Sequence, residues 1–456
     1  MHARRATLGW LLLLFATAAK AQSTHVGPGA PTERRSGGRA RIYYVAADEV
    51  DWTFIPTRAD QALTGRKDDF AGFPGSQGTL DPNSTTYRKA RFREYTDSSF
   101  RTLRPRDERW EHLGVLGPLF RAEVGDTIRV VFRNHATRPY SMHPHGVFYR
   151  KDSEGTAYLD GTRGADRMDD SVPPGRTHVY SWPVPERAGP ADGDGSTAFW
   201  LYHSHVDEGK DINAGLIGPI IVTRRGMARA DGSPKDFDRE FIADFGLFDE
   251  IDSWYLDSNV VRLYGDPKKF ARDDGKVREF HRFFTINGFL EGNGPMLTMR
   301  QGDRVRWYLF TNPNEVGAWD IHSPHWHGQT VVANHMRTDM IMLTPMMTSM
   351  ADMVPDIRAC GSFTATCPDT SVAGCTRASP CCPQLHDERP PHAVDRREPL
   401  GAVRALIRRD AADRPDDAVA WPSPIGSPAG DERQPRPPAC DVNAEHLSLR
   451  CCTNRP

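Results

Sequence analysis

Histidines gather in three short clusters of this 456-residue sequence, at a spacing suited to metal binding. The clusters lie at residues 142–146 (MHPHG), 202–206 (YHSHV) and 322–328 (HSPHWHG). Side chains two residues apart on an extended strand point to the same side. Neutral imidazole is a ligand for copper and zinc. The clusters therefore predict a site for several metal ions, with these candidate ligands: His143, His145, His203, His205, His322, His325 and His327.

A single H-x-H pair has a simpler interpretation, namely two histidines with ordinary hydrogen bonds in a core or at a surface. Pro144 and Pro324, inside two of the clusters, interrupt regular strand pairing and are typical of strand ends that direct side chains into a site. Three clusters on a repeated β unit favour the metal site over the simpler interpretation.

The elements that must position these histidines are short strands. Alternating, β-branched and aromatic runs are separated by Gly, Pro and Asp, which is typical of an all-β sandwich. These runs lie at 41–47, 126–134, 178–184, 198–206, 216–222, 239–245, 278–288, 303–310 and 328–335. The motif GD-x-[IV]-R occurs at 125–129 and again at 302–306, followed each time by a histidine cluster. This internal repeat predicts two tandem Greek-key sandwiches.

Composition divides the chain further. Residues 1–21 have the form of a secretory signal peptide, so we expect export to the periplasm or the extracellular space. We expect a linker at 22–40, a first sandwich at 41–224, a linker at 225–237 and a truncated second sandwich at 238–356. Residues 357–456 contain no Lys and little alternation, which predicts an aberrant or disordered tail.

The histidine motifs and the sequence between them resemble the multicopper oxidases, which are built from cupredoxin (plastocyanin-like) sandwiches. The resemblance is closest to the ceruloplasmin and hephaestin branch, which is also related to the coagulation-factor A domains. It covers about residues 41–356 and includes these stretches: EYTD at 94–97, LGP at 116–118, KDSEG at 151–155, and 203–219.

The resemblance implies a role for each candidate ligand. His143 and His325 would bind type 2 copper, and His322 would bind type 1 copper. The type 3 pair would be held by His145, His203, His205 and His327. Asp169 and Asp170 stand where this branch can bind calcium, although a solvated turn explains them equally well.

The implied activity is a laccase-like or ferroxidase-like oxidation. One-electron oxidation of a reductant, with Fe(II), Cu(I) and phenols all open, would be coupled to four-electron reduction of O2 to water. With two sandwiches per chain, a trinuclear copper cluster between neighbouring subunits would require a homotrimer.

The sequence departs from the family after Asp356, where an H-C-H…H…M motif is expected and none follows. All eight cysteines stand at Cys360 or later, and none is flanked by histidine. A type 1 site without its thiolate cannot admit electrons, so we expect impaired turnover in this chain. A frameshift near codon 356 of a GC-rich gene explains the tail; a divergent, metal-binding C-terminus is the other interpretation.

Other classes of function are less compatible with the sequence. The net charge of −2 gives no electrostatic reason to bind nucleic acid, and no later run approaches the roughly 18 apolar residues of a membrane span. A copper nitrite reductase would need a cysteine in the first sandwich. Copper binding or buffering without redox turnover is the main alternative, and a metal-free interaction module is a weaker one.

Overall fold

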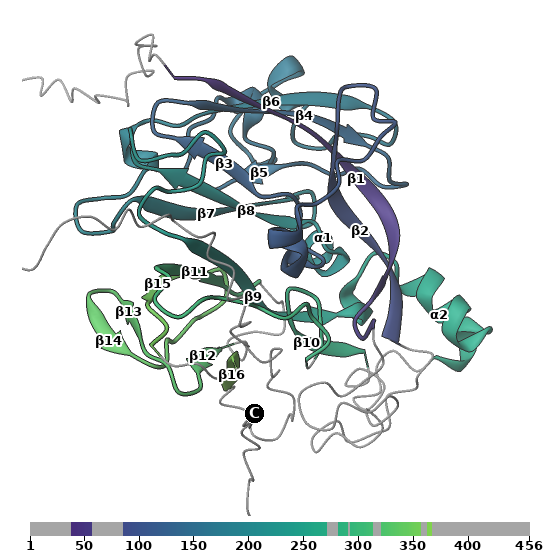
Figure 1. The fold of residues 1–456 in the computed structure, drawn as a ribbon. Helices are drawn as coiled ribbons and strands as arrows, with labels where there is room; N and C mark the ends of the chain where they lie inside the picture. Colours follow the sequence, from purple (N-terminus) through teal and green to yellow (C-terminus); the bar gives the residue numbers. More distant parts are fainter. Residues whose placement is uncertain are drawn as a thin grey trace, which may run out of the picture. The chain divides into compact units, whose positions relative to one another are not determined.

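The computed structural model describes residues 38–56, 85–270, 281–290, 292–312, 321–356 and 363–366. Strands dominate these residues and form two β-sandwiches (Figure 1), so the all-β prediction is confirmed. The expected signal peptide, most of the first linker and most of the tail lie outside the described residues. Within the described part, no helix is both long and apolar enough to cross a membrane.

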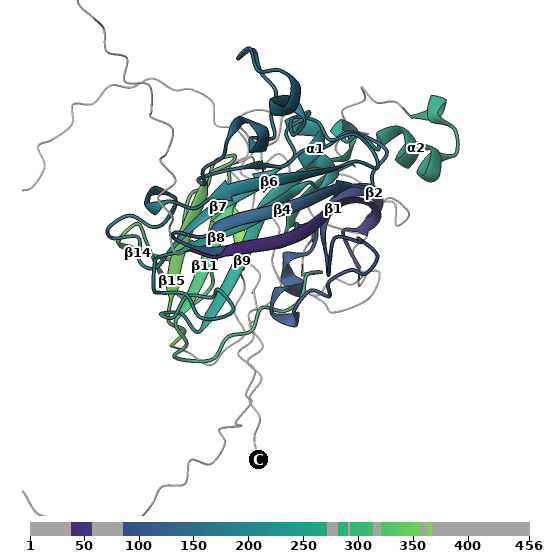
Figure 2. The ribbon, with the colours of Figure 1, turned by 90° about the horizontal axis from the view of Figure 1, so that it is seen from above.

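The first sandwich consists of two four-stranded sheets. One has the order β2-β1-β4-β6, from β1 (Ala40–Thr53), β2 (Thr86–Tyr95), β4 (Thr127–Asn134) and β6 (Thr177–Pro183). Figure 2 shows these strands side by side. The other has the order β3-β8-β7-β5, from β3 (Phe120–Glu123), β8 (Ile217–Thr223), β7 (Thr197–His203) and β5 (His143–Pro144).

Burial explains the hydrophobic patterns of these strands. Along β4, Ile128, Val130 and Phe132 are buried in the core between the two sheets, while the residues between them are more exposed. Every residue of β8 is buried. Its Ile220 and Val222 join the core of the first sandwich, whereas Ile217 and Ile221 join a second cluster with residues of the second sandwich.

The second sandwich has a six-stranded sheet in the order β10-β9-β11-β15-β13-β14 and a two-stranded sheet, β12-β16. The larger sheet contains β9 (Arg239–Asp249), β10 (Arg282–Ile286), β11 (Val305–Phe310), β13 (Val331–Ala333), β14 (Met336–Thr338) and β15 (Thr348–Met353). The smaller sheet contains β12 (Ser323–Trp326) and β16 (Phe363–Thr366).

Helices are short. In the part of the chain that the structure describes, the α-helices are α1 (Glu208–Ala214), directly after the second histidine cluster, and α2 (Leu256–Tyr264). Short 3-10 helices of the described residues are η3 (Glu108–Leu113), η4 (Lys151–Ser153), η5 (Gly164–Arg167), η6 (Glu186–Ala188), η7 (Glu250–Asp252) and η8 (Pro267–Lys269).

The repeated GD motif occupies the same place in both sandwiches. Gly125 has φ 103° and Gly302 has φ 85°, a left-handed conformation that glycine adopts at little cost. Each glycine precedes a strand that pairs in parallel with the first strand of its own sandwich, β4 with β1 and β11 with β9. The internal repeat in the sequence thus corresponds to a repeated piece of topology.

Strand β16 lies beyond Asp356, inside the range where we expected an aberrant tail. It pairs antiparallel with β12, and the side chain of Phe363 is fully buried. The Phe363 ring centroid lies 4.5 Å from that of Trp307 and 5.2 Å from that of Trp326. The second sandwich therefore extends at least to Thr366, and one buried phenylalanine of the tail completes its core.

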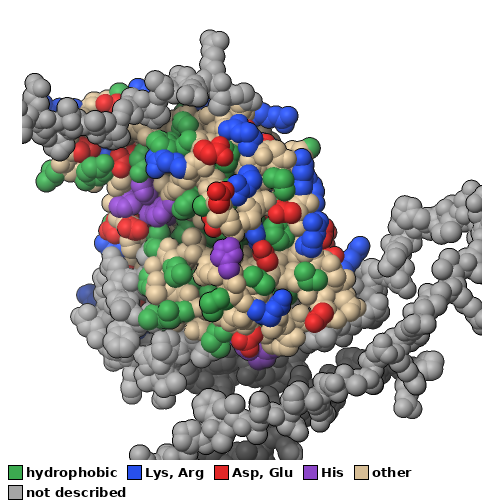
Figure 3. Space-filling view, turned by 90° about the vertical axis from the view of Figure 1, so that its left-hand side faces the viewer, with side chains coloured by type: hydrophobic (Ala, Val, Ile, Leu, Met, Phe, Trp, Pro, Cys, Tyr) green, Lys and Arg blue, Asp and Glu red, His purple; other side chains and the backbone are tan. Residues whose placement is uncertain are grey.

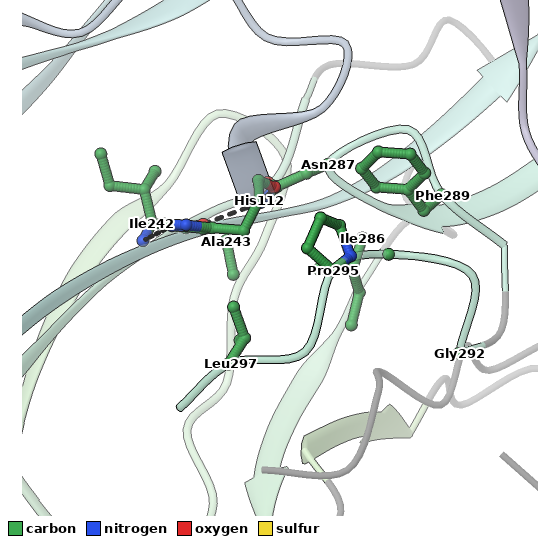
Figure 4. Close-up of a pocket in the computed structure, with 10 residues that line it drawn as sticks. His112, Ile242, Ala243, Ile286, Asn287, Phe289, Gly292, Pro295 and Leu297 are labelled. Carbon is green, nitrogen blue, oxygen red and sulfur yellow. Dashed lines mark hydrogen bonds between the residues drawn. The ribbon is translucent and has the colours of Figure 1, made fainter. Parts of the chain in front are cut away.

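Polar contacts join the two sandwiches. Arg121 of β3 pairs with Glu240 of β9 at 2.7 Å, and the Tyr308 hydroxyl donates to the same carboxylate at 2.9 Å. His112 Nε2 accepts from the Ile242 amide at 3.2 Å, and burial lowers the pKa of His112 to about 3. A cavity of about 30 Å³ beside His112 (Figure 4) has room for little more than a water molecule, so His112 is a structural histidine.

Candidate metal centre

Four of the predicted ligands form one cluster at the end of the β5–β7 pair. His143 lies directly opposite His203 in the antiparallel register, and His145 and His205 each lie two residues further along the chain, just beyond β5 and β7. The ring centroid of His143 lies 5.4 Å from that of His145, 5.6 Å from that of His203 and 5.3 Å from that of His205. The first two sequence clusters therefore converge.

The closest approach within this cluster joins His145 and His203. Their Nε2 atoms lie 3.0 Å apart. Metal–nitrogen bonds of imidazole are about 2.0–2.1 Å long, so two nitrogens at this separation are spaced as neighbouring ligands of a single ion. The observed donor set therefore fits a metal ion on this pair.

Hydrogen bonds fix which ring nitrogen faces the cluster. His143 Nδ1 lies 2.6 Å from the Glu154 carbonyl oxygen, and His203 Nδ1 lies 3.0 Å from that of Ser204. Because a carbonyl oxygen only accepts, each Nδ1 must donate its hydrogen. The lone pair of each neutral ring is then on Nε2, which is the usual tautomer of a metal-ligating histidine.

Burial keeps these imidazoles neutral. Burial lowers the pKa of His143, and it lowers the pKa of His145 to about 4. The charges of neighbouring histidines lower both pKa values further. Burial, followed by the charge of His145, also lowers the pKa of His203 well below its ordinary value. Neutral imidazole at pH 7 is the protonation state that metal binding requires.

A buried carboxylate holds the loop between β7 and α1. Asp211 Oδ2 accepts from the Ser204 hydroxyl at 2.6 Å and from the Val206 amide at 3.0 Å, and Oδ1 accepts from Trp254 Nε1 at 2.8 Å. The Ser141 hydroxyl accepts from the His205 amide at 3.0 Å. These bonds fix the backbone on either side of His203 and His205.

Two polar residues of the cluster were not predicted. Glu208, in the first turn of α1, has carboxylate oxygens 3.8 Å from His203 Nε2 and 3.6 Å from His205 Nε2. Thr156 Oγ1 lies 3.0 Å from His205 Nδ1. Glu208 lies three residues after His205. This spacing brings its side chain to the histidines only because a helix begins at Glu208, which the sequence did not predict.

The third histidine cluster lies in the second sandwich, around β12: His325 is on the strand, His322 directly precedes it and His327 directly follows it. The ring centroids of His325 and His327 are 4.8 Å apart, while Trp326 between them is buried. His325 Nδ1 lies 3.0 Å from the Asp339 carbonyl oxygen, so this ring too has its lone pair on Nε2. His322 is buried, with its amide bonded to the Leu343 carbonyl oxygen at 2.9 Å.

The structure does not bring the two groups of histidines together. In Figure 1, β5 lies in the upper sandwich and β12 lies in the lower one, with β9 and β11 between them. Histidine side chains are visible at separate places on the face shown in Figure 3. Among the described residues, no set of three or more His, Cys, Asp or Glu side chains could hold a metal ion. Each group alone thus offers pairs of ligands.

Asp169 and Asp170, the candidate calcium ligands, are both buried. Asp169 Oδ2 accepts from the Gly155 amide at 2.7 Å, and Arg167 Nε lies 3.3 Å from Asp170 Oδ2. The remaining Oδ1 atom of each residue is buried without a hydrogen-bond partner. Burial raises the pKa of both side chains. Two buried carboxylate oxygens without partners fit a hard cation such as calcium.

Comparison with known proteins identifies a family and several relatives. A family model described as multicopper oxidase matches residues 113–226, which include the first two histidine clusters. Ferroxidase HEPHL1 of Mus musculus is 41% identical over 73% of this chain and 28% of its own length. Hephaestin of Homo sapiens is 40% identical over 70% of this chain and 27% of its own. Ceruloplasmin of Homo sapiens is 38% identical over 73% of this chain and 31% of its own.

The chain thus spans less than a third of the length of these relatives. Within that part, the match to the family model falls on the sandwich whose four imidazoles converge. The resemblance stated from the histidine motifs is confirmed: this chain belongs to the multicopper oxidase family.

Proposed function

We propose that this chain is an exported, ferroxidase-like copper protein whose trinuclear copper cluster assembles between subunits. The four-imidazole cluster of β5 and β7, with Nδ1 of His143 and His203 bound to backbone carbonyls, carries the proposal. Fe(II) is the favoured reductant because one relative is named a ferroxidase; Cu(I) and phenols are the other candidates. Bound copper would transfer electrons from the reductant to O2.

The residues of the chain would prepare this site in three ways. His143 with His325 would hold type 2 copper. The type 3 pair would be held by His145, His203, His205 and His327. Glu208 has a carboxylate within 3.8 Å of two Nε2 atoms, a position from which it could supply protons consumed when O2 is reduced.

A homotrimer accounts for the separation of the two ligand groups. His143, His145 and His205 are only partly buried, and His327 is exposed. The histidines of the first sandwich of one protomer would then meet His325 and His327 of a neighbouring protomer. The first sandwich of each protomer would face the second sandwich of the next. Asp169 and Asp170 would bind calcium beside the first group.

Turnover would be impaired in this chain. His322 would be the single type 1 ligand left, because no H-C-H motif follows Asp356 and all eight cysteines stand in the tail, residues 357–456. Without a thiolate, the electron entry site is incomplete. The chain would then retain copper without passing electrons to O2, which is also the behaviour of a copper-buffering protein.

Two measurements test the proposal in order. The first is DNA sequencing across codons 340–400 with translation of all three frames; we expect an H-C-H…H…M motif in another frame soon after codon 356. The second is copper loading of the full chain, followed by metal analysis, visible absorption and O2 uptake with Fe(II). We expect bound copper without a blue thiolate band or uptake. A chain that takes up no copper would disprove the proposal.

A further inference from the structure

A cavity separate from the histidine clusters lies beside β1 and β2 of the first sandwich. Its volume is about 920 Å³, and its walls come from these strands, the segment 103–121 and Phe289. This volume lies within the range of about 300–1,000 Å³ that is usual for small-molecule sites. It does not include any of the predicted copper or calcium ligands.

Two guanidinium groups of the cavity wall are held side by side by one short stretch of backbone. Arg91 donates through Nε to the Val115 carbonyl oxygen at 2.8 Å and through Nη2 to that of Gly114. Arg106 donates to the same Gly114 oxygen at 3.0 Å and to that of Leu116 at 2.6 Å. The carbonyls fix both groups and leave further N–H groups of each fork available.

These two charges lack the carboxylate partners that their neighbours have. Among the described residues, neither Arg91 nor Arg106 forms an ion pair, whereas other arginines of the cavity do: Arg93 with Asp48 at 3.5 Å, Arg104 with Glu94 at 2.9 Å, and Arg121 with Glu240 at 2.7 Å. Burial, followed by the charges of Arg106 and Arg93, lowers the pKa of Arg91 to about 9. An anion placed here would relieve this repulsion.

The carboxylates that line the cavity do not pair with Arg91 or Arg106. Asp51, Glu94 and Asp107 are paired with arginines, namely Arg262 at 3.1 Å, Arg104 at 2.9 Å and Arg109 at 2.9 Å. Glu111, the remaining carboxylate of the wall, is exposed. It acts on Arg106 only as a nearby charge that raises its pKa against the lowering caused by burial.

Aromatic rings form the apolar part of the wall. The Arg91 guanidinium lies 4.9 Å from the Trp52 ring centroid, and the Trp52 and Phe289 centroids are 5.2 Å apart. Trp110 also lines the cavity, with the Arg121 guanidinium 5.1 Å from its centroid. Arginine beside aromatic surface suits a ligand with a negative charge and a planar apolar part.

We propose that this cavity binds a small aromatic carboxylate, with its charge against Arg91 and Arg106 and its ring against Trp52, Trp110 and Phe289. The site is independent of copper loading and of the proposed oxidase function. A carboxylate matches the planar, forked donor geometry of guanidinium, and an aromatic ring would replace water along the apolar wall.

Isothermal titration calorimetry of the full chain with benzoate tests this proposal. Benzamide, which lacks the charge, and inorganic phosphate, which lacks the ring, are the matched ligands. We expect one benzoate per chain, bound at least tenfold more tightly than either. Arg106→Gln should weaken benzoate binding at least tenfold, while Arg106→Lys should recover part of the loss. Arg129→Gln, which removes an exposed arginine outside the cavity, should change it less than twofold.

Equal affinity for benzamide or for phosphate would overturn the proposal, since charge or ring would then contribute nothing. Absence of saturable benzoate binding would overturn it as well. If Arg106→Gln does not fold, because the carbonyls of Gly114 and Leu116 lose their donor, the comparison of the three ligands on the unsubstituted chain decides the outcome. Circular dichroism of each variant separates loss of binding from loss of fold.

Discussion

His145 and His203 face each other through their Nε2 atoms at 3.0 Å, although they belong to different sequence clusters. Antiparallel pairing of β5 with β7 creates this contact, since it places His143 opposite His203 and Pro144 opposite Tyr202. His203 donates through Nδ1 to its neighbouring carbonyl, so in the metal-free protein His145 must donate through Nε2. A metal ion on this pair would replace that hydrogen bond.

Removing one member of this pair should therefore weaken copper binding. We expect His145→Ala to lower the affinity for Cu(II) at least tenfold, because the cluster loses a ligand while His203 stays in place. Competition with a coloured copper chelator measures the change. His335→Ala, at an exposed histidine away from the cluster, is the control and should leave the affinity unaltered. Equal affinities of the two variants would contradict the assignment.

Asp211 should be as important for the site as a ligand, although it would not touch the metal. Its carboxylate, fully buried, accepts from Ser204, Val206 and Trp254. Asp211→Asn would replace an acceptor with an amide donor, and we expect a loss of about 2–3 kcal/mol in the free energy of unfolding. Copper affinity should fall about 10–100-fold, as for other groups that orient ligands.

Asp207→Asn is the matched control for that experiment. Asp207 caps α1 by accepting from the Lys210 amide, and asparagine caps a helix about as well as aspartate, so this substitution should lower the free energy of unfolding by less than about 0.5 kcal/mol. Urea unfolding and copper competition on both variants provide the two measurements. A wild-type copper affinity in Asp211→Asn would show that the loop keeps its conformation without this carboxylate.

The sequence was informative where the chemistry depends on local spacing. The alternation in HWH predicts neighbouring rings for His325 and His327, and their ring centroids lie 4.8 Å apart while Trp326 between them is buried. The GD turns also lie before equivalent parallel strands. Both patterns are set by neighbours within a few residues, where the period of a strand or the freedom of glycine decides the conformation.

Features that depend on contacts between residues distant in the sequence could not be predicted from local spacing. Glu208 reaches the histidines only because α1 begins directly after β7. The four residues of β16 are too few for a pattern, and their place depends on Phe363 filling a gap beside Trp307. The cavity of Arg91 and Arg106 depends on the path of residues 114–116, on which no motif bears.

A buried ion pair predicts how stability changes with pH. Lys89 of β2 pairs with Glu250, and both side chains are fully buried. Burial raises the pKa of Glu250 to about 7 and lowers the pKa of Lys89. Between pH 4.5 and 7 the native protein therefore holds a proton on Glu250 that the unfolded chain releases. This contribution to stability is complete below pH 4.5 and is lost as pH rises through 7.

Urea unfolding at pH 5 and pH 8 tests this prediction. We expect the difference in unfolding free energy between the unsubstituted chain and Glu250→Gln to change by on the order of 1–3 kcal/mol, in favour of the unsubstituted chain at the lower pH. Glu186→Gln, at a glutamate whose side chain is mostly exposed, should show no such change. A difference that is independent of pH would mean that Glu250 stays ionised in the folded protein.

Phe363 allows a test of whether the tail contributes to the fold. Its ring is fully buried and contacts the rings of Trp307, Trp326 and Phe245, which belong to three other strands. Phe363→Ala would leave a cavity in the core of the second sandwich, and we expect a loss of about 3–5 kcal/mol in the free energy of unfolding. Thermal and urea unfolding of the full chain measure this loss.

Val354→Ala is the control, because Val354 is 59% exposed and lies just before the tail that begins at residue 357. This substitution should lower the free energy of unfolding by less than about 0.5 kcal/mol. A large loss of unfolding free energy in Phe363→Ala, with none in Val354→Ala, would mean that residues beyond Asp356 cover the core of the second sandwich. Equal, small costs would mean that β16 does not form in solution and that the core ends at β15.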